Sequence, residues 1–192
     1  MKPLHPRGLS TRRLDLRPTT PADHPQLVAL EADPEVMRFL NGGQPVPEAG
    51  CPDADYLTPR GTEPEVLVAH ERGTGRFIGW FAMFDDGWVD GLRTAETGYR
   101  LHRAAWGQGF ATEGVAALVE QAFETLGFDR VQARTLAGNT GSRRVLEKAG
   151  FHHTGTVFPA FVQALPGGQA GEVVYERRRA PGPGGGERLA TP

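Results

Sequence analysis

A strand-like segment, a pair of glycines and a helical stripe of apolar residues follow one another in the middle of this chain. The strand-like segment runs from Thr97 to His102, Gly107 and Gly109 come next, and apolar residues then recur at helical spacing. The stripe consists of Ala111, Val115, Leu118, Val119, Ala122, Phe123 and Leu126. The first turn of a helix leaves backbone N–H groups without partners and carries the positive end of the helix dipole. Because glycines let a bulky anion approach these groups closely, the stretch predicts a phosphate-binding turn between a strand and a helix.

Two other interpretations of these glycines are a tight turn without a ligand and a dinucleotide-binding fingerprint. The stretch from Gly107 to Thr112 lacks the third glycine of that fingerprint, and no acidic residue ends a second strand about 20 residues later. Glu124 and Asp129 instead lie inside or just after the predicted helix. The sequence therefore disfavours a Rossmann-type site.

A second block of motif residues runs from Asn139 to Phe151 and contains Asn-Thr-Gly-Ser and Glu-Lys-Ala-Gly-Phe. Together with Trp106-Gly107-Gln108-Gly109-Phe110-Ala111, it resembles the GCN5-related N-acetyltransferase (GNAT) superfamily, whose pyrophosphate-binding pattern is Gln/Arg-x-x-Gly-x-Gly/Ala. Trp106 departs from that pattern, but a motif that begins with tryptophan resembles the branch that includes the ribosomal-protein-alanine N-acetyltransferases. The resemblance extends from about Arg12 to Glu176, nearly the whole chain.

The resemblance implies an α/β (α+β) fold: a central, mixed, mostly antiparallel and twisted β-sheet of six to seven strands, flanked by about four helices. The apolar patterns predict strands at 12–17, 65–71, 76–84, 97–102, 130–136, 151–158 and 172–177. Helices are predicted after Thr20, Asp33, Gly109 and Asn139. The intervening segments 85–91 and 159–171 are predicted to be a connection and a loop.

Residues 44–64 are rich in proline and predict a long loop or a poorly regular helix. In the resembled family this region helps to shape the acceptor pocket, and a mobile insertion is the alternative. We expect residues 1–178 to form one domain and 179–192 to form a disordered tail rich in glycine and proline.

Composition excludes several classes of protein. A hydrophobic content of 39% and a formal net charge of −2 argue against nucleic-acid binding driven by bulk charge. No apolar run is long enough to predict a membrane span, and neither a signal peptide nor a membrane partner is expected. The single cysteine, Cys51, has no partner for an internal disulfide, and no Cys/His spacing indicates a metal site. We therefore expect a cytoplasmic protein without a metal cofactor.

Acetyl transfer from a thioester to an amine requires a grip on coenzyme A, an oxyanion partner, a proton acceptor and a donor for the leaving thiolate. The resemblance implies acetyl-CoA as co-substrate, with its pantetheine arm alongside Tyr99 to His102 and its thioester carbonyl near the backbone N–H of Leu101. The predicted cofactor-binding residues are Leu101, His102, Arg103, Gly107, Gln108, Gly109, Phe110, Ala111, Thr112, Asn139 and Ser142.

Glu96 is the predicted base, acting directly or through a water, and its alternative role is a solvent-facing strand residue. By the resemblance, Ser142 is the predicted acid near the coenzyme A sulfur, and its alternative role is a first-turn capping residue. Tyr99 and Tyr175 are alternative donors or core residues. Weaker candidates for the base are Asp85, Asp86 and Asp90.

The sequence thus predicts an N-acetyltransferase that moves an acetyl group from acetyl-CoA to a primary amine, by direct attack in a ternary complex. The acceptor is expected to be a protein N-terminus or a small-molecule amine. The alternatives are a catalytically inactive coenzyme A-binding sensor or interaction module, and a nucleotide-binding protein. Pairing of an exposed last strand with a second copy leaves a homodimer open.

Overall fold

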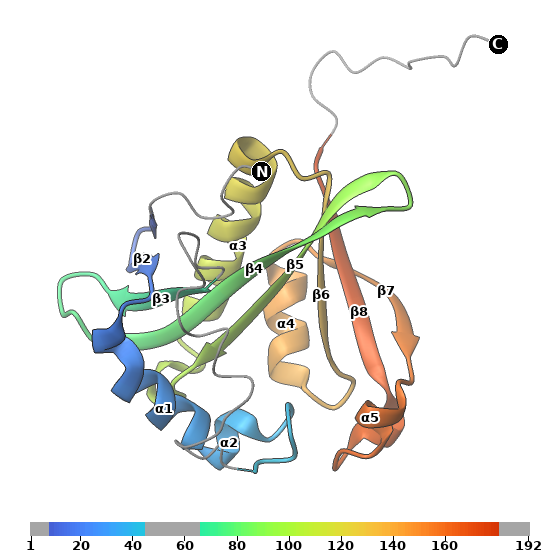
Figure 1. Ribbon diagram of the computed structural model, residues 1–192, viewed down its shortest axis with the longest axis horizontal. Coiled ribbons are helices and arrows are strands. Elements are labelled where there is room, and N and C mark those ends of the chain that lie inside the picture. Colours follow the sequence, from blue (N-terminus) through green and yellow to red (C-terminus); the bar gives the residue numbers. More distant parts are fainter. Residues whose placement is uncertain (1–7, 45–65, 181–192) are drawn as a thin grey trace, which may run out of the picture.

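The computed structural model describes residues 8–44 and 66–180. Eight strands within these residues form one sheet, in the order β1-β2-β3-β4-β5-β6-β8-β7 (Figure 1). Neighbouring strands are antiparallel except β5 and β6, which confirms the predicted mixed, mostly antiparallel sheet. The strands are β1 Leu9–Ser10, β2 Leu14–Pro18, β3 Val66–Glu71, β4 Phe77–Val89, β5 Leu92–Leu101, β6 Arg130–Leu136, β7 His152–Val157 and β8 Glu172–Arg178.

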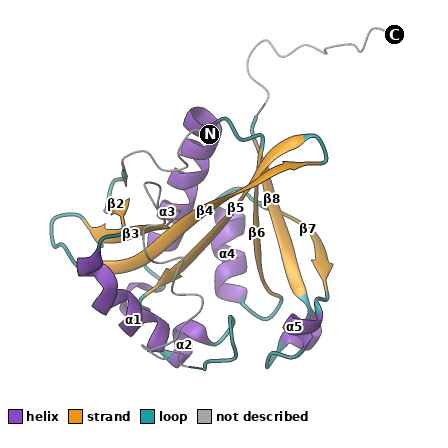
Figure 2. Ribbon diagram, in the orientation of Figure 1, coloured by secondary structure: helices purple, strands orange, loops and turns teal. Residues whose placement is uncertain are grey.

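Helices cover both faces of the sheet (Figure 2). Trp80 and Phe81 are adjacent in β4 and therefore point to opposite faces. Phe81 belongs to the larger core, which includes residues of α3 and α4, whereas Trp80 packs with residues of α1 and α2. The molecule thus has three layers with the sheet in the middle. The helices are α1 His24–Ala32, α2 Pro34–Met37, α3 Phe110–Gln121, α4 Thr140–Lys148 and α5 Ala160–Gln163.

Each of the seven segments predicted as strands overlaps one, although β5 begins five residues earlier than predicted, and β1 makes the described sheet one strand larger than the upper prediction. The prediction of a connection at 85–91 was wrong, because β4 continues to Val89 and only Asp90 and Gly91 form the turn. Their φ angles are 53° and 76°, as a two-residue hairpin turn that follows the strand twist requires. The pattern concealed this extension because the hairpin leaves the compact body, and Trp88 near its tip is 73% exposed.

The prediction of a loop at 159–171 was wrong in part, because α5 and a short 3-10 helix, Gly168–Ala170, lie within it. A helix of four residues is too short to show an apolar period. Residues 45–64 of the proline-rich segment lie outside the described residues, as does 181–192 of the predicted tail, so the domain boundaries stay a prediction. Across 8–44 and 66–180, no helix has the length and apolar character needed to cross a bilayer.

Local signals determine both ends of the helix that follows the glycine turn. Gly109 is the residue before α3, with φ of 82°. After a π-helical turn, Ala122–Leu126, the chain leaves the helix at Gly127, whose φ is 77°. These positive φ angles explain the glycines at the two ends.

A third glycine, Gly114, sets the distance between α3 and the sheet. A Cβ atom at this position would lie 2.3 Å from Cζ of the buried Phe81 ring. Because real Cβ contacts are never so short, the absence of a side chain lets α3 lie directly on β4. This close packing positions the start of α3 relative to the strands.

We expect Gly114→Ala to lower the free energy of unfolding by about 1–3 kcal/mol, since overpacking a rigid core outweighs the gain of about 1 kcal/mol in helix propensity. Urea unfolding monitored by circular dichroism measures the change. The matched control is Gly141→Ala in α4, where the nearest atom would be 3.7 Å away and φ is not positive. That variant should be neutral or more stable by about 0.4–1 kcal/mol. Equal effects at the two positions would contradict the role assigned to Gly114.

Candidate active site

A gap opens in the middle of the sheet where β5 and β6 part. In the described chain these strands pair at Thr94–Arg130, Ala95–Val131 and Glu96–Gln132. β5 then continues with β4 to Leu101, while β6 continues with β8 to Leu136. Figure 2 shows the two strands diverging, with α4 behind them. Glu96 therefore stands at the point where the gap begins.

Backbone groups of β5 point into this gap. The N–H of His102 donates to the carbonyl of Ile78 on β4 at 2.9 Å. Because successive strand residues direct their backbone groups to alternate sides, the N–H and C=O groups of Leu101 and Tyr99 point away from β4. The Leu101 carbonyl accepts a bond of 2.8 Å from the indole N–H of Trp106. The predicted oxyanion partner, the Leu101 N–H, is thus directed to the side from which β6 has departed.

The glycine turn has the conformation that the phosphate prediction requires. Gly107 and Gly109 have φ angles of 72° and 82°, and the turn from 107 to 109 is exposed. Helical bonding begins with the N–H of Glu113, which donates to the Gly109 carbonyl at 3.0 Å. The N–H groups of residues 110–112 precede that bond and stand at the positive end of α3. This arrangement suits an anion.

Two predicted cofactor residues shape the turn through their side chains. His102 Nδ1 accepts from the N–H of Ala104 at 3.3 Å. The Gln108 side-chain amide donates to the carbonyl of the same Ala104 at 2.5 Å. Arg103, between them, is exposed. The side chains of His102 and Gln108 therefore bind the protein. The His102 N–H, which donates to Ile78, and the Gln108 carbonyl, which accepts from Arg13, do so as well.

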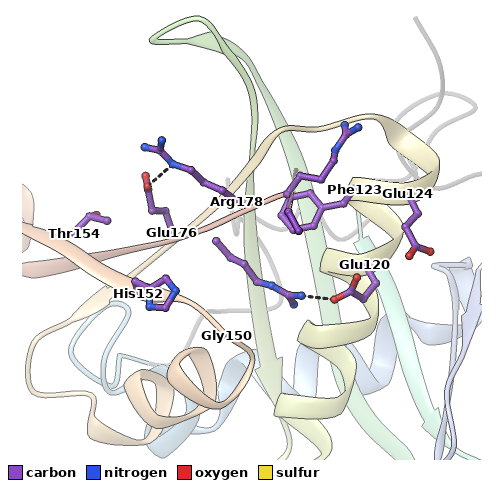
Figure 3. Close-up of a pocket in the computed structure, with 11 residues that line it drawn as sticks. Glu120, Phe123, Glu124, Gly150, His152, Thr154, Glu176 and Arg178 are labelled. Atoms are coloured by element: carbon purple, nitrogen blue, oxygen red, sulfur yellow. Dashed lines mark hydrogen bonds and ion pairs between the residues drawn. The ribbon is translucent and has the colours of Figure 1, made fainter. Parts of the chain in front are cut away.

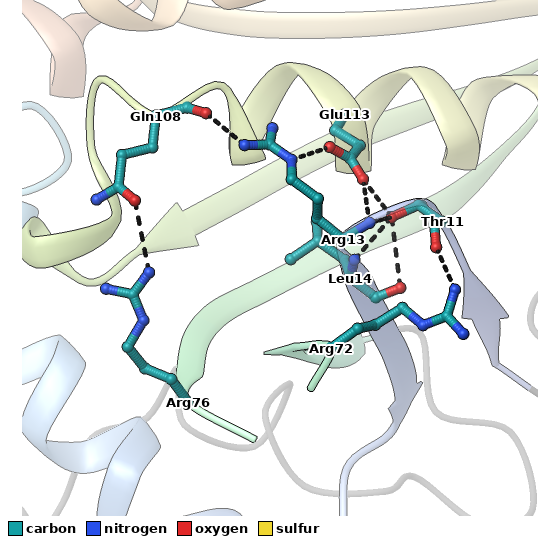
Figure 4. Close-up of polar contacts among 7 residues, drawn as sticks. All are labelled: Thr11, Arg13, Leu14, Arg72, Arg76, Gln108 and Glu113. Carbon is teal, nitrogen blue, oxygen red and sulfur yellow. Dashed lines mark hydrogen bonds and ion pairs between the residues drawn. The ribbon is translucent and has the colours of Figure 1, made fainter. Parts of the chain in front are cut away.

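The turn between β1 and β2, residues 11–13, holds the glycine turn and the start of α3 from the other side (Figure 4). The Glu113 carboxylate accepts from Thr11 Oγ1 at 2.6 Å, and from the backbone N–H and Nε of Arg13 at 2.7 Å each. The same arginine donates to the Gln108 carbonyl at 2.9 Å and lies 4.5 Å from the centroid of the Phe110 ring. Burial acts to raise the pKa of Glu113, but the hydrogen bonds from Thr11 and Arg13 outweigh it and lower the pKa. Sequence reasoning missed these contacts, because Thr11 and Arg13 are 102 and 100 residues away from Glu113 in the chain.

On the α4 side of the gap, the side chain of Ser142 contacts that of Tyr99. Asn139 caps α4 as predicted, and its Oδ1 accepts from the Ser142 N–H at 3.1 Å. The hydroxyl of Tyr99 lies 2.9 Å from Ser142 Oγ. Burial raises the pKa of Tyr99 to about 12, although the hydrogen bond with Ser142 lowers it. Tyr175, the other candidate donor, is fully buried and bonds Arg143 and Glu147 of α4 instead.

Glu96 lies on the opposite face of the sheet from Tyr99, because the two are three residues apart in one strand. Its Oε2 is 3.6 Å from Nε of Arg134. Burial raises the pKa of Glu96, Arg134 lowers it, and the nearby carboxylates of Asp86 and Glu172 raise it further. The net effect is a carboxyl whose pKa lies above its usual value, as a general base requires.

The other acidic candidates belong to the β4–β5 hairpin. Asp85 Oδ2 is 3.1 Å from Arg93 of β5. Asp90 forms the turn and lies 3.6 Å from Arg130. Asp86 is exposed at the surface, but partial desolvation of its carboxylate, helped by the nearby charge of Asp85, raises its pKa. Of the three, Asp86 is the one whose charge acts on Glu96.

A buried ionic network borders the face that carries Glu96. The Glu31 carboxylate of α1 accepts from Arg100 of β5 and, at 3.3 Å, from the indole N–H of Trp80. The Arg100 guanidinium lies 5.2 Å from the centroid of the Trp80 ring. Because Arg100 and Glu96 are four residues apart in β5, they share one face. Sequence reasoning missed this network, since no local pattern links α1 to β5.

A hollow of about 850 Å³ lies at the other end of α3 (Figure 3). Its lining includes Glu120, Phe123 and His152, and none of the predicted catalytic or cofactor-binding residues, all of which are described. Glu120 is ten residues along the helix from Phe110, or about 15 Å at 1.5 Å per residue. The hollow is thus separate from the glycine turn.

Comparisons with known proteins agree with this geometry. A family model described as an acetyltransferase (GNAT) domain matches residues 13–152. The chain is 31% identical to the FsC-acetyl coenzyme A-N(2)-transacetylase of Aspergillus fumigatus, over 89% of this chain and 76% of that protein.

Two solved structures show that the fold is shared. The GNAT-family acetyltransferase from Bacillus anthracis superposes with a TM-score of 0.72 and 18% identity, over 89% of this chain and 98% of that one. The aminoglycoside acetyltransferase AAC(6')-Ib in complex with coenzyme A gives a TM-score of 0.65 and 21% identity, over 86% of this chain and 95% of that one.

We expect Glu113→Gln to lower the free energy of unfolding by about 1.5–3 kcal/mol at pH 7, because charged hydrogen bonds to Arg13 and Thr11 are lost. The folded-state pKa lies below 4.5, so this stabilisation is present above pH 4.5 and is lost as the pH falls through the folded pKa. Urea unfolding of both proteins at several pH values should therefore show a difference that shrinks in acid.

The control is Glu120→Gln on the same helix, whose half-exposed carboxylate pairs with Arg177. Exposed ion pairs contribute about 0–1 kcal/mol, so this variant should stay close to wild type. A loss as large as that of Glu113→Gln would show that the contacts of Glu113 with Thr11 and Arg13 have no special role.

Proposed function

This chain belongs to the GNAT acetyltransferase family and is an acetyl-CoA-dependent N-acetyltransferase, and from that premise we propose that it transfers the acetyl group directly to a primary amine in a ternary complex. The observation that carries the proposal is the gap between β5 and β6, which begins at Glu96 and faces the N–H of Leu101. Direct attack needs both substrates at one thioester, and the gap is bordered by side chains on both faces of the sheet, with Glu96 on one and Tyr99 on the other.

In this proposal coenzyme A runs from the glycine turn into the gap. The N–H groups of residues 107–112 bind the pyrophosphate, where each charge gains about 0.3–1 kcal/mol, or up to ~2 when partly buried. The pantetheine arm lies beside Tyr99 to His102 and bonds the backbone groups that point away from β4. Asn139 donates its side-chain amide to the arm, since its Oδ1 already caps α4. Arg103 lies next to the turn and adds positive charge for the phosphates.

The chemistry is divided between the faces of the sheet. The Leu101 N–H polarises the thioester carbonyl, an effect of about 3–4 kcal/mol per donor in measured cases. Glu96 takes the proton that the amine loses, directly or through a water. Ser142, on the α4 side, donates to the departing sulfur. Because an α-amine has a pKa near 8 and a lysine near 10.4, the acceptor arrives charged, and the raised pKa of Glu96 suits its deprotonation.

The acceptor is a small-molecule amine or a peptide N-terminus. The Aspergillus relative is named for transfer to a nitrogen, N(2), which supports an amine acceptor. The Trp106 motif predicts the ribosomal-protein-alanine branch, and with it a protein N-terminus. A panel of kanamycin, a polyamine and peptides with N-terminal alanine or serine separates these classes by the rate of coenzyme A release. Acetyl-CoA binding without turnover on any amine would favour the inactive-module alternative.

Acetyl-CoA should stabilise the purified protein against thermal unfolding, whereas NAD and ATP should not. At 100 times its dissociation constant, a ligand adds ~2.7 kcal/mol, or roughly 5–11 °C for a domain of this size. Differential scanning fluorimetry measures the shift. The absence of a shift with acetyl-CoA would mean that the glycine turn is a turn without a ligand.

Glu96→Gln should lower kcat by about 10²–10⁴-fold without reducing the thermal shift with acetyl-CoA, since it removes a base and not a cofactor contact. In the wild type, activity should rise as Glu96 loses its proton, and this acid limb should lie above pH 4.5 because its pKa is raised. Steady-state kinetics across the pH range measure the loss of activity and the position of the acid limb, and differential scanning fluorimetry measures the thermal shift.

Glu172→Gln is the matched control, because it removes a neighbouring carboxylate that raises the pKa of Glu96. We expect it to retain the plateau activity and to move the acid limb to lower pH. An unchanged pH profile in both variants would exclude Glu96 as the base.

A further inference from the structure

Two hydroxyl groups meet where β5 faces the first turn of α4. Tyr99 Oη lies 2.9 Å from Ser142 Oγ and 3.4 Å from the Ser142 carbonyl oxygen. Tyr99 is two residues before Leu101 in β5, and Ser142 is three residues after the cap of α4. The pair therefore joins the strand that offers the oxyanion donor to the helix that offers the sulfur donor.

We propose that Tyr99 is a positioning residue for acetyl transfer: its phenol donates to Ser142 Oγ and so directs the serine proton toward the coenzyme A sulfur. This inference rests on the proposed function, in which Ser142 faces the departing sulfur. It adds a residue outside both recognised motif blocks.

The hydrogen-bond inventory of the two hydroxyls supports this direction. Each hydroxyl has one proton to donate and lone pairs to accept. If Ser142 donated to Tyr99, it would have no proton for the sulfur. The hydroxyl of a serine in a helix can instead donate to a backbone carbonyl one turn earlier, but here Ser142 Oγ is paired with the Tyr99 hydroxyl. The buried phenol keeps its proton at neutral pH, since its pKa is raised to about 12.

Both members of the pair are held by their own elements. The Tyr99 ring packs against Phe81, with the centroids 6.0 Å apart, and joins the edge of the larger core. Ser142 is held by the Asn139 cap. Tyr175 separately ties α4 to β8, because its hydroxyl accepts from Arg143 at 3.1 Å and donates to Glu147 at 2.9 Å. Contacts within the protein thus already hold the two hydroxyls in hydrogen-bond distance.

The acceptor ammonium first gives one proton to Glu96, which passes it to solvent. The neutral amine nitrogen then forms a bond to the acetyl carbon and gives a second proton to Glu96, while the carbon–sulfur bond breaks and its electron pair leaves on sulfur. A thiol has a pKa near 8.5, well below that of an aliphatic hydroxyl, so the proton stays on Ser142. Ser142 therefore stabilises the thiolate as a hydrogen-bond donor, and Tyr99 keeps that donor aimed.

A double-mutant cycle tests the inference. kcat is measured by coenzyme A release, at saturating acetyl-CoA and with the fastest acceptor of the panel, for wild type, Tyr99→Phe, Ser142→Ala and the double variant. We expect Ser142→Ala to lower kcat roughly 10- to 150-fold and Tyr99→Phe roughly 2- to 12-fold. In the Ser142→Ala background, Tyr99→Phe should change kcat by less than about twofold. KM for acetyl-CoA should stay near wild type in both single variants.

Tyr175→Phe is the matched control, because it removes a buried tyrosine hydroxyl that also holds α4. Its effect should persist in full when Ser142 is alanine, as a structural effect does. If Tyr99→Phe behaves in the same way, or leaves kcat unchanged while Ser142→Ala lowers it, the inference is overturned and the proposed acetyl transfer stands. A wild-type protein that transfers no acetyl group to any amine would overturn both.

Discussion

The separation of β5 from β6 is the constraint on which the candidate site depends. Backbone N–H and C=O groups that lie inside a protein need partners, and a strand that loses its neighbour leaves a row of them. The protein satisfies one itself, through the bond from the Trp106 indole to the Leu101 carbonyl. The N–H groups on the same side of β5 are directed into the gap. An extended amide-containing arm, such as pantetheine, has the hydrogen-bonding groups of an additional strand.

Contacts between distant parts of the chain fix the position of the glycine turn relative to the sheet and its gap. Arg13 and Glu113 are 100 residues apart in sequence, yet their hydrogen bonds join the turn just before β2 to the start of α3. Gly114 lets the same helix lie close to β4. A turn that the protein already holds in one conformation spares a ligand the entropy cost of ordering it. The core therefore contributes to the proposed binding of coenzyme A.

Because strand side chains alternate between the two faces of the sheet, the residues proposed to act on the amine and on the sulfur lie on different faces. Glu96 and Tyr99 come from one strand and point to opposite faces, so the proposed base and the Ser142 hydroxyl that Tyr99 contacts approach the gap from opposite sides. Glu96 shares its face with the buried network of Glu31 and Arg100, while Tyr99 shares its face with α3 and α4. An amine and a thiolate therefore need not compete for one space.

The sequence by itself determined the elements, because caps, glycines and apolar periods act over a few residues. It predicted the strand, the glycine turn and the helix around Gly107, and the Asn139 cap of α4. It missed the outer part of the β4–β5 hairpin, residues 85–96, whose exposed tip shows no apolar alternation. Only the tertiary structure decided that Tyr99 touches Ser142 and that Arg13 binds Glu113. Such pairs depend on which strands neighbour one another, and a local pattern carries no record of that order.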